Sequence, residues 1–593
     1  MTFTPRFSTL QDLFAQATST HAERPLFGTK RGERWVWTTY ADFARDVTQL
    51  RAALASHGVR KGDRVAIIAD NRVEWAVACH AAAGLGAPFV PMYEAQLPKD
   101  WAFILRDCGA RALFVANTAI AEQIATVRDE LPALQHVFVL DGDDGASDWA
   151  DLLARGQAEP VPPIPVEPDD TAGFIYTSGT TGDPKGVLLS HRNLASNASA
   201  ALDVYPIRPD DRSLSFLPWA HSYGQVAELH TLMGAGASMA LAEAVSKIVA
   251  NLAEVQPTLL VSVPRIFNRI YDGVHRSMAE AGGARQWIFQ RAIANGEEQR
   301  TLAEQGSSSW RVDLLARLYD RLVFSKVRAR FGGRLQYAIS GGAALSPAVG
   351  AFISTLGITV FEGYGLTETS PVVAANAPGA HRLGTVGKPL PGVRVVLDHE
   401  VTDDPVDGEI IVYGHNVMQG YFGLPAENER VFTADGGLRT GDMGRLDDDG
   451  YLRITGRIKE QYKLENGKYV VPTPLEEQLK LAPLVANALV YGANRPYNIA
   501  LIVPDWEAAR SWAASQGLPQ EPAALIGHPM LQSAIEEQVW AQAEDFKHYE
   551  RPRRIGLVDS DFTTENGMLT PSLKVKRRVV LQHHQALVAS LYD

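Results

Sequence analysis

The sequence predicts an α/β protein with a large N-terminal domain, made of layered α/β subdomains and a small β-subdomain, followed by a smaller, mobile α+β C-terminal domain. Two observations support this fold class. Over the first 150 residues, apolar helical stretches such as residues 40–57 alternate with short apolar strands such as 64–68 and 112–115, an alternation typical of layered α/β folds. After Gly384 the chain becomes rich in strands broken by Pro-Gly and Asp-Gly turns, which predicts the β-subdomain.

The length of 593 residues exceeds what one hydrophobic core usually supports. We expect an N-terminal domain over residues 1–456, a hinge at 457–460, where charged residues interrupt the strand pattern, and a C-terminal domain over 461–593. Residues 269–330 are polar and helical in pattern, so we expect a helical excursion there. Five prolines in residues 156–170 predict an extended surface connection.

The composition is that of a globular protein, with 46% hydrophobic and 21% charged residues. The net charge of -12 argues against a general nucleic-acid binder, which would need an excess of lysine and arginine. Cys79 and Cys108 are too few for a disulfide framework, which fits a reducing compartment. The sequence shows no signal peptide and no membrane span, so we expect a cytoplasmic protein; contact with the inner face of the membrane stays open, although no amphipathic anchor stands out.

Residues 176–186 read Tyr-Thr-Ser-Gly-Thr-Thr-Gly-Asp-Pro-Lys-Gly and form the most informative segment. Its glycines let the backbone approach an anion, its hydroxyls can donate, Lys185 adds a charge, and Thr177 could face a metal. The loop joins two short apolar strands, and Pro184 precedes the lysine. The next helix begins only after Ser190, which we expect to be its N-cap, so this is not a Walker loop. A flexible linker is the alternative, and a lysine between apolar strands disfavours it.

Residues 363–369, Gly-Tyr-Gly-Leu-Thr-Glu-Thr, follow the apolar strand 358–361. Open α/β sheets commonly place ligands at the carboxyl ends of their strands. Glu368 could therefore hold Mg2+ beside bound phosphates, because magnesium prefers a few oxygen ligands together with water and substrate phosphate. A solvated glutamate on a surface turn is the alternative when this segment is viewed alone.

These two segments together resemble the nucleotide-binding motifs of the acyl-adenylate-forming ligases, which include acyl-CoA synthetases, peptide-synthetase adenylation domains and luciferases. Further segments that match the family in order are residues 340–343, 408–421, 439–442 and 565–578. The match covers nearly the whole chain. We assign the segment containing Gly420 and Tyr421 to the architecture of the β-subdomain.

The long-chain acyl-CoA synthetase branch is the part of the family that the chain resembles most. Residues 263–267, 462–469, 494–505 and 569–577 carry this resemblance. The chain departs from the commoner pattern at two places. Leu573 stands where many members have glycine before the adenylation lysine, and residues 465–468 replace a Ser-Gly-Gly-Glu type turn, which puts the detailed CoA contacts in doubt.

The resemblance implies an enzyme that uses ATP and CoA as co-substrates, Mg2+ as the metal and a fatty acid as the acyl donor. The residues implied in catalysis are Thr177, Lys185, His221, Glu368 and Lys574, with Thr177 and Glu368 as metal ligands. The residues implied in binding ATP or CoA are Ser178, Gly179, Thr180, Thr181, Gly182, Gly341, Gly342, Gly363, Tyr364, Gly365, Thr367, Asp442, Arg457, Lys459 and Lys463.

Individual roles follow from the same resemblance. Tyr364 would stack on adenine, Thr367 would lie near the α-phosphate, and Asp442 would accept hydrogen bonds from the ribose hydroxyls. Lys574 would bridge carboxylate and α-phosphate oxygens as charge moves. Taken without the other motifs, the segment around Lys574 reads more readily as a solvated basic tail.

The same resemblance implies a domain movement and an acyl site. The C-terminal domain would rotate about Lys459, so that Lys574 leaves and the face around residues 463–467 enters, with Arg457 anchoring the hinge near ribose. Residues 217–224 would open the acyl pocket, with His221 near the substrate carboxylate and Trp219 either gating that pocket or packing.

The implied reaction activates a fatty acid, a long-chain acid in particular, as acyl-adenylate and transfers the acyl group to CoA, releasing AMP and pyrophosphate. One alternative is a ligase that delivers the acyl-adenylate to an acyl-carrier protein. Another is a non-catalytic acyl or nucleotide sensor. The sequence sets neither the acyl chain length nor the oligomeric state.

Overall fold

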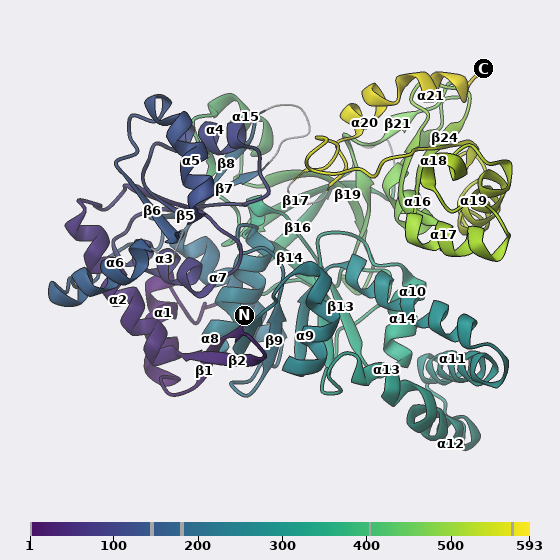
Figure 1. Ribbon diagram of the computed structural model, residues 1–593, viewed down its shortest axis with the longest axis horizontal. Coiled ribbons are helices and arrows are strands. Elements are labelled where there is room, and N and C mark those ends of the chain that lie inside the picture. The colour runs from purple at the N-terminus through teal and green to yellow at the C-terminus, as the bar shows by residue number, and fades with distance from the viewer. Residues whose placement is uncertain (1–2, 143–146, 178–182, 402–404, 571–573) are drawn as a thin grey trace.

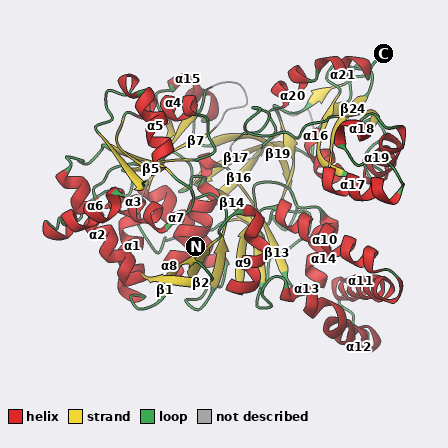
Figure 2. Ribbon diagram, in the orientation of Figure 1, coloured by secondary structure: helices red, strands yellow, loops and turns green. Residues whose placement is uncertain are grey.

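The computed structural model of the protein describes residues 3–142, 147–177, 183–401, 405–570 and 574–593 (Figure 1). It confirms the predicted fold class, with layered α/β units in the larger N-terminal part and a smaller C-terminal domain beside it. The helices lie against the sheets of each unit (Figure 2). Within the described ranges, no helix is both long enough and apolar enough to cross a membrane.

A seven-stranded sheet forms the first layer, with strand order β18-β8-β7-β4-β3-β5-β6. Strands β4, β3, β5 and β6 run parallel to one another, while β8 and β18 add antiparallel partners beyond β7. The strands are β3 (Arg64–Ile68), β4 (Phe89–Met92), β5 (Ala110–Asn117), β6 (His136–Asp141), β7 (Thr171–Thr177), β8 (Lys185–Ser190) and β18 (Gly420–Tyr421). Helix α2 (Tyr40–Ser56) precedes β3, and the helices between the strands are α3 (Val73–Gly84), α4 (Pro98–Cys108), α5 (Thr118–Thr126) and α6 (Asp148–Ala158).

Helix α7 (His191–Val204) follows β8 directly, and Ser190 caps its N-terminus as predicted. The Ser190 hydroxyl accepts from the Asn193 backbone N–H, and the Asn193 side chain accepts from the Ser190 backbone N–H. These two bonds satisfy two amides, one of which the first helical turn would otherwise leave without a partner. The strand-loop-strand arrangement before this helix confirms that residues 176–186 are not a Walker loop.

A five-stranded sheet forms the second layer, with strand order β11-β12-β13-β14-β15. Its strands are β11 (Leu259–Ser262), β12 (Tyr337–Ser340), β13 (Thr359–Gly365), β14 (Val372–Ala375) and β15 (Lys388–Pro389). The predicted helical excursion is confirmed between β11 and β12. It comprises α10 (Pro264–Ala281), α11 (Gly283–Glu304), α12 (Trp310–Tyr319), the π-helical turn η5 (Asp320–Phe324) and α13 (Ser325–Ala329), and α14 (Pro347–Thr355) follows β12.

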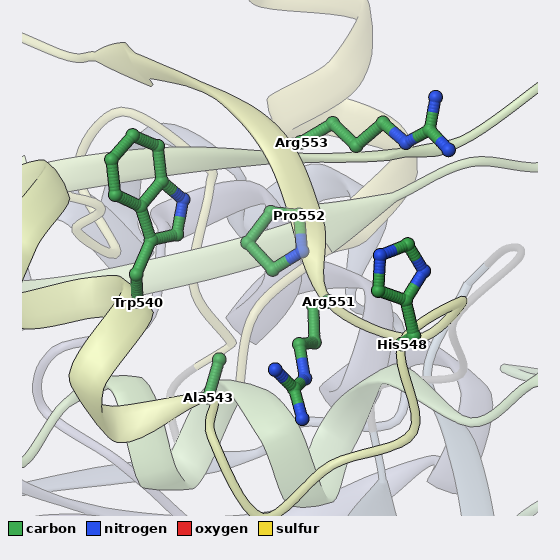
Figure 3. Close-up of a pocket in the computed structure, with 6 residues that line it drawn as sticks. All are labelled: Trp540, Ala543, His548, Arg551, Pro552 and Arg553. Carbon is green, nitrogen blue, oxygen red and sulfur yellow. The ribbon is translucent and has the colours of Figure 1, made fainter.

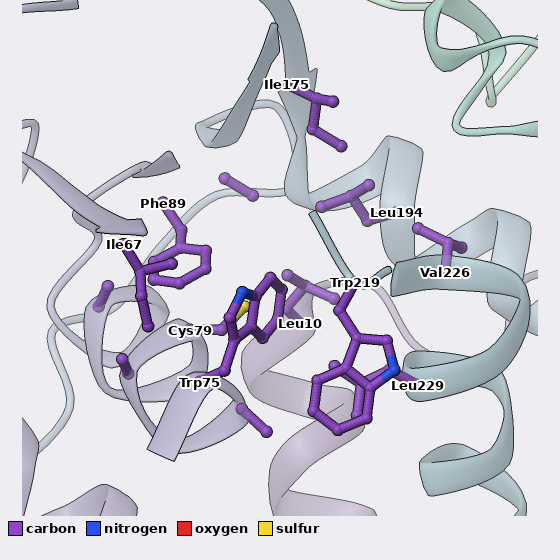
Figure 4. Packing of buried hydrophobic residues seen from close by; sticks show 14 of the residues in the cluster. Leu10, Ile67, Trp75, Cys79, Phe89, Ile175, Leu194, Trp219, Val226 and Leu229 are labelled. Carbon is purple, nitrogen blue, oxygen red and sulfur yellow. The ribbon is translucent and has the colours of Figure 1, made fainter. Parts of the chain in front are cut away.

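A third, four-stranded sheet has the order β2-β1-β10-β9. Its strands are β1 (Pro25–Arg31), β2 (Arg34–Thr39), β9 (Arg212–Ser215) and β10 (Ser238–Leu241), with α1 (Leu10–Thr20), α8 (Thr231–Ala235), α9 (Ile248–Val255) and the π-helix η3 (Tyr223–His230) around it. Figure 4 shows part of the core, where side chains of the seven-stranded sheet meet those of α1, α3, α7 and η3. The indole of Trp219 is fully buried there, with ring centroids 5.6 Å from both Trp75 and Phe27. Trp219 therefore packs in this structure.

The β-subdomain is a four-stranded antiparallel sheet of β16 (Val393–Asp398), β17 (Gly408–Gly414), β19 (Leu438–Leu446) and β20 (Leu452–Arg457), with α15 (Pro425–Val431) preceding β19. The C-terminal domain is built on the sheet β23 (Val485–Tyr491), β24 (Asn498–Pro504) and β25 (Pro552–Leu557). Its other elements are β21 (Tyr462–Lys463), β22 (Tyr469–Val470), α16 (Pro472–Leu479), α17 (Trp506–Ser515), α18 (Pro522–Leu525), α19 (Pro529–Gln542), α20 (Arg577–His583) and α21 (Gln585–Ser590).

Candidate active site

Thr177 and Lys185 are directly paired across the antiparallel β7–β8 hairpin. Side chains that stand opposite each other in a sheet point to the same face, so both emerge where the hairpin loop begins. The predicted loop residues Ser178, Gly179, Thr180, Thr181 and Gly182 lie outside the described residues. The hairpin therefore fixes the base of the predicted phosphate loop.

The ammonium of Lys185 already has a carboxylate partner. Its Nζ lies 2.7 Å from Oε2 of Glu427 on α15 and 5.2 Å from the ring centroid of Tyr421. Both side chains of the ion pair are about one quarter exposed. A polyphosphate binding at this hairpin would compete with Glu427 for Lys185.

Tyr421 connects Lys185 to Glu368. Its hydroxyl donates a 2.8 Å hydrogen bond to Oε1 of Glu368. The assignment of Gly420 and Tyr421 to the β-subdomain is wrong, because β18 pairs with β8 in the seven-stranded sheet. That pairing brings the phenol to the phosphate hairpin, and no local sequence pattern indicates this distant partner.

The carboxylate of Glu368 and the hydroxyl of Thr177 are oxygen donors of the kind that magnesium takes. Among the described residues, no group of three or more His, Cys, Asp or Glu side chains forms a metal site. The residues present thus fit a cation that takes one protein carboxylate and obtains most of its ligands from phosphate and water.

Glycines shape strand β13 at the second motif. A side chain at Gly365 would bring Cβ within 1.9 Å of the Pro371 carbonyl oxygen, so only glycine fits there. Gly363 is less constrained, since its closest neighbour would be 3.4 Å from an added Cβ. Strand β13 continues through Gly365 in antiparallel pairing with β14, so the motif begins inside the strand rather than after it.

Tyr364, Asp442 and Arg457 form one polar cluster. The Tyr364 hydroxyl donates to Oδ2 of Asp442 at 2.7 Å, and Arg457 Nε lies 2.9 Å from Oδ1. Asp442 is buried, and this burial raises its pKa, while the Arg457 guanidinium and the Tyr364 hydroxyl act in the opposite direction. The predicted adenine, ribose and hinge residues are therefore in direct contact.

Gly341 and Gly342 follow β12 beside the ring of Tyr223. A Cβ at Gly341 would lie 3.0 Å from Cζ of Tyr223, and Gly342 has a φ of 82°, which favours glycine. The Tyr223 hydroxyl donates to the carbonyls of Ser262 and Ile339, at 3.1 and 3.2 Å. Tyr223 therefore holds the two strand ends that carry the predicted adenine wall.

The predicted acyl segment meets the nucleotide segment through Ser222 and Thr367, whose hydroxyl oxygens are 3.2 Å apart. His221 Nδ1 accepts from the Tyr223 backbone N–H at 3.1 Å, so Nε2 carries the ring proton of the neutral form. Burial, reinforced by the nearby Lys574 ammonium, lowers the pKa of His221 to about 4. His221 is then a neutral hydrogen-bond donor near neutral pH.

Lys574 reaches this site from the C-terminal domain. Its side chain is exposed to water, yet the surrounding protein lowers its pKa through desolvation and the nearby Arg457, while Asp442 and Glu368 act in the opposite direction. The charge of the Lys574 ammonium also helps to lower the pKa of His221. Lys574 therefore lies within electrostatic reach of three separate N-terminal segments, those of His221, Glu368 and Asp442.

Lys459 lies close enough to Glu427 to help Lys185 and Arg430 lower the pKa of that carboxyl, whereas Lys463 lies on β21. Lys459 is exposed in the turn after β20, and the Lys463 ammonium lies 4.6 Å from the ring centroid of Tyr469. The C-terminal domain contains a cavity of about 190 Å3, and Figure 3 shows the side chains that line it. None of the predicted site residues borders that cavity, whose lining is Trp540, Ala543, His548, Arg551, Pro552 and Arg553.

Sequence reasoning missed four contributors to this site: Ser222, Tyr223, Tyr421 and Glu427. Two of them, Ser222 and Tyr223, are in a segment that the sequence did single out. Tyr421 was also noticed but was placed in the wrong sheet. For Glu427, on a short exposed helix, nothing in the sequence marks a link to Lys185.

Known sequence patterns match most of the chain. The AMP-binding enzyme pattern matches residues 13–422, and that of the AMP-binding enzyme C-terminal domain matches residues 459–593. The chain is 35% identical over 580 residues to a long-chain-fatty-acid–CoA ligase from Mycobacterium tuberculosis, covering 94% of this chain and 93% of that protein. It is 31% identical over 620 residues to the peroxisomal long chain acyl-CoA synthetase 7 of Arabidopsis thaliana, covering 99% and 87%.

Solved structures share the fold. The adenylation domain of a carboxylate reductase from Mycobacterium chelonae superposes with a TM-score of 0.80 at 24% identity, covering 98% of this chain and 91% of that one. An anthranilate CoA ligase in complex with anthranoyl-AMP gives a TM-score of 0.74 at 21% identity, covering 99% of both chains.

Proposed function

Because this chain belongs to the AMP-binding enzyme family, we propose that it is an ATP-dependent ligase that joins a fatty acid, a long-chain acid in particular, to coenzyme A. Relatives that align with nearly the whole chain are named for this activity, which supports the proposed reaction class. The products are acyl-CoA, AMP and pyrophosphate, formed in two half-reactions.

In the first half-reaction, a carboxylate oxygen of the acid attacks the α-phosphorus of ATP, and the bond from that phosphorus to pyrophosphate breaks. Lys185 and the hairpin loop would hold the departing phosphates, and Thr367 would contact the α-phosphate. Lys574 would offset the charge that develops on the attacking and phosphoryl oxygens, where a placed cation stabilises the transition state. Its electrostatic reach to His221, Glu368 and Asp442 supports this role.

The metal and the acid have their own contacts. Magnesium held by Glu368 and Thr177 would offset phosphate charge when bound. The neutral His221 would donate its Nε2 proton in a hydrogen bond to the acid's carboxylate, which orients the attacking oxygen. Tyr364 and the Gly341–Gly342 turn would hold adenine, and Asp442 would accept from ribose.

In the second half-reaction, the CoA thiolate attacks the acyl carbonyl and AMP leaves with the shared oxygen. We propose that the domains divide at residues 457–460 and that the C-terminal domain rotates about Lys459. This movement withdraws Lys574 and brings in the face that carries Lys463. Arg457 would keep its contact with Asp442 as the fixed point of the movement.

The observation that carries the proposal is the convergence of Lys574 with residues from three N-terminal segments. The test is an assay of pyrophosphate release and thioester formation with ATP, CoA and carboxylic acids from short to very long. Acid-dependent pyrophosphate release with acyl-CoA as product is expected. If the acyl group were transferred to a holo-carrier protein and not to CoA, the acceptor assigned here would be wrong. If no acid-dependent pyrophosphate release were seen, the protein would be a non-catalytic sensor.

A further inference from the structure

Helix α12 and the π-helical turn η5 expose large apolar side chains to water. Trp310 is 71% exposed, Leu314 58% and Leu318 50%, and Leu315 and Leu322 are exposed as well. Soluble proteins tolerate single exposed apolar residues, but a contiguous group marks an interaction surface. The sequence predicts a polar, helical excursion here and singles out no amphipathic anchor.

The exposed residues share one side of the helix. Trp310, Leu314 and Leu318 are four positions apart, a spacing that aligns side chains along a helix. Val312, Phe324 and Val327 are buried on the side that faces the protein, where α12 packs against α11. Figures 1 and 2 show α11 and α12 at one extremity of the molecule, so this side is open.

Arginines lie among the exposed apolar residues. Arg311, Arg317 and Arg321 are all exposed, and the Arg311 guanidinium lies 5.4 Å from the Trp310 ring centroid. On neighbouring α11, Arg291 lies 5.2 Å from the ring centroid of Trp287, which is 57% exposed. The α12 face is defined here as Trp310, Arg311, Leu314, Leu315, Arg317, Leu318, Arg321 and Leu322.

The charge of this segment opposes that of the whole chain. Residues 310–330 contain six arginines and lysines but only two acids, in a chain of net charge -12. Both acids already have partners, since Asp313 accepts from Gln299 and Asp320 pairs with Arg328. Among the residues that the structure describes, Arg311, Arg317 and Arg321 form no salt bridge, so these cations of the α12 face can act on a partner.

We propose that the α12 face docks on an anionic lipid bilayer and lies in its interfacial plane. Tryptophan and leucine side chains enter the headgroup region, and arginines among them contact anionic lipid, which is the composition of interfacial helices. A second copy of the chain fits less well, because an isologous dimer would set the same arginines against each other. The inference does not depend on the proposed function, although it would bring the enzyme to the phase where long-chain acids reside.

Site-specific labelling tests this docking without substrates. Cys79 and Cys108 are buried, so an environment-sensitive thiol dye can be placed at Leu314→Cys. Met530→Cys is the control, because Met530 is 45% exposed on α19 in the C-terminal domain. We expect vesicles of phosphatidylglycerol and phosphatidylcholine to shift the emission of the dye at position 314 to the blue and to leave position 530 unchanged.

Two outcomes would overturn the proposal. One is an unchanged emission at position 314 with vesicles present. The other is a shift that appears without vesicles as protein concentration rises, which would assign the face to self-association. Failure of the acyl-CoA assay would leave the vesicle result untouched, so the two proposals fail separately.

Charge removal gives a second, independent measurement. Each arginine near an anionic surface changes partitioning by about fivefold, so Arg311→Gln, Arg317→Gln and Arg321→Gln together should reduce vesicle binding by about a hundredfold. The matched control removes three exposed arginines elsewhere: Arg34→Gln, Arg155→Gln and Arg510→Gln. Equal loss in both triple variants would contradict a local docking face, and circular dichroism and melting temperature check that each variant is folded.

Discussion

The Tyr421 hydroxyl donates a hydrogen bond to the carboxylate of Glu368, and this bond joins the edge strand of the seven-stranded sheet to the second nucleotide motif. If it orients Glu368 toward magnesium, Tyr421→Phe should raise the Mg2+ concentration for half-maximal pyrophosphate release by about ten- to a hundredfold, as loss of one hydrogen bond to a metal-binding carboxylate implies. Tyr413→Phe is the control, because Tyr413 bonds Asp435 instead. An unchanged magnesium dependence in Tyr421→Phe would contradict the orienting role.

Replacing Lys574 should separate the two half-reactions. Lys574→Ala should reduce acid-dependent pyrophosphate release by about a hundredfold or more, because it removes a cation placed at the developing charge. Thioester formation from supplied acyl-adenylate should fall much less. The control is Lys576→Ala, two residues further along the chain. Equal loss in both half-reactions would remove Lys574 from its assigned role.

Glu427 should act as a competitor for Lys185. Because their ion pair is about three quarters shielded, Glu427→Gln should free the ammonium and lower the KM for ATP by about two- to fivefold. Glu429→Gln changes the same charge on an exposed position of the same helix and serves as control. A large rise in KM would show instead that Glu427 holds Lys185 in its binding position.

The buried histidines predict acid sensitivity. Burial lowers the pKa of His80 to about 3, and those of His191 and His221 to about 4. In the unfolded chain these rings titrate near ~6.5, so from there down to ~4 the unfolded state binds more protons and stability falls with pH, by up to about 1.4 kcal/mol per pH unit per ring. The melting temperature should therefore fall between pH 7 and pH 5, as differential scanning fluorimetry can measure.

A buried carboxyl opposes this trend over part of the range. Burial raises the pKa of Glu228 to about 8, against the hydrogen bonds from Ser213 and Ser215. The Glu228 carboxyl stays protonated in the folded state, whereas in the unfolded chain it ionises above pH ~4.3. Its contribution to the free energy of unfolding therefore falls as pH rises. Replacing His80 with Leu should reduce the fall of melting temperature between pH 7 and pH 5, and replacing the exposed His548 with Asn should leave that fall unchanged. An equal fall in both variants would contradict a role of buried His80 in acid sensitivity.

Local sequence features predicted the fold class well because each rests on neighbouring residues. The strand alternation near Arg64–Ile68 and the Ser190 cap need only a few adjacent positions. The strand-loop-strand order around Lys185 was likewise readable from Pro184 and the flanking apolar runs.

Contacts between distant segments could not be read in this way. Lys185 and Glu427 are 242 positions apart, and Tyr421 and Glu368 are 53 apart. A single sequence gives the residue types but not which edge strand pairs with which sheet, so Tyr421 was assigned to the wrong one. The exposure of Leu314 and Leu318 was missed for a related reason, since helical periodicity does not tell which apolar side of an excursion is covered.

Because Thr177 pairs with Lys185, the register of β7 and β8 determines the face of the sheet to which the Lys185 side chain points, and the length of the loop between them does not. Residues could be added to or removed from the turn between β7 and β8 while these two side chains keep the same face. One residue inserted within β8 ahead of Val187 would turn Lys185 to the opposite face of the sheet. Length changes at the tip of this hairpin should accordingly leave the direction of Lys185 unchanged, whereas an insertion a few positions later should reverse it.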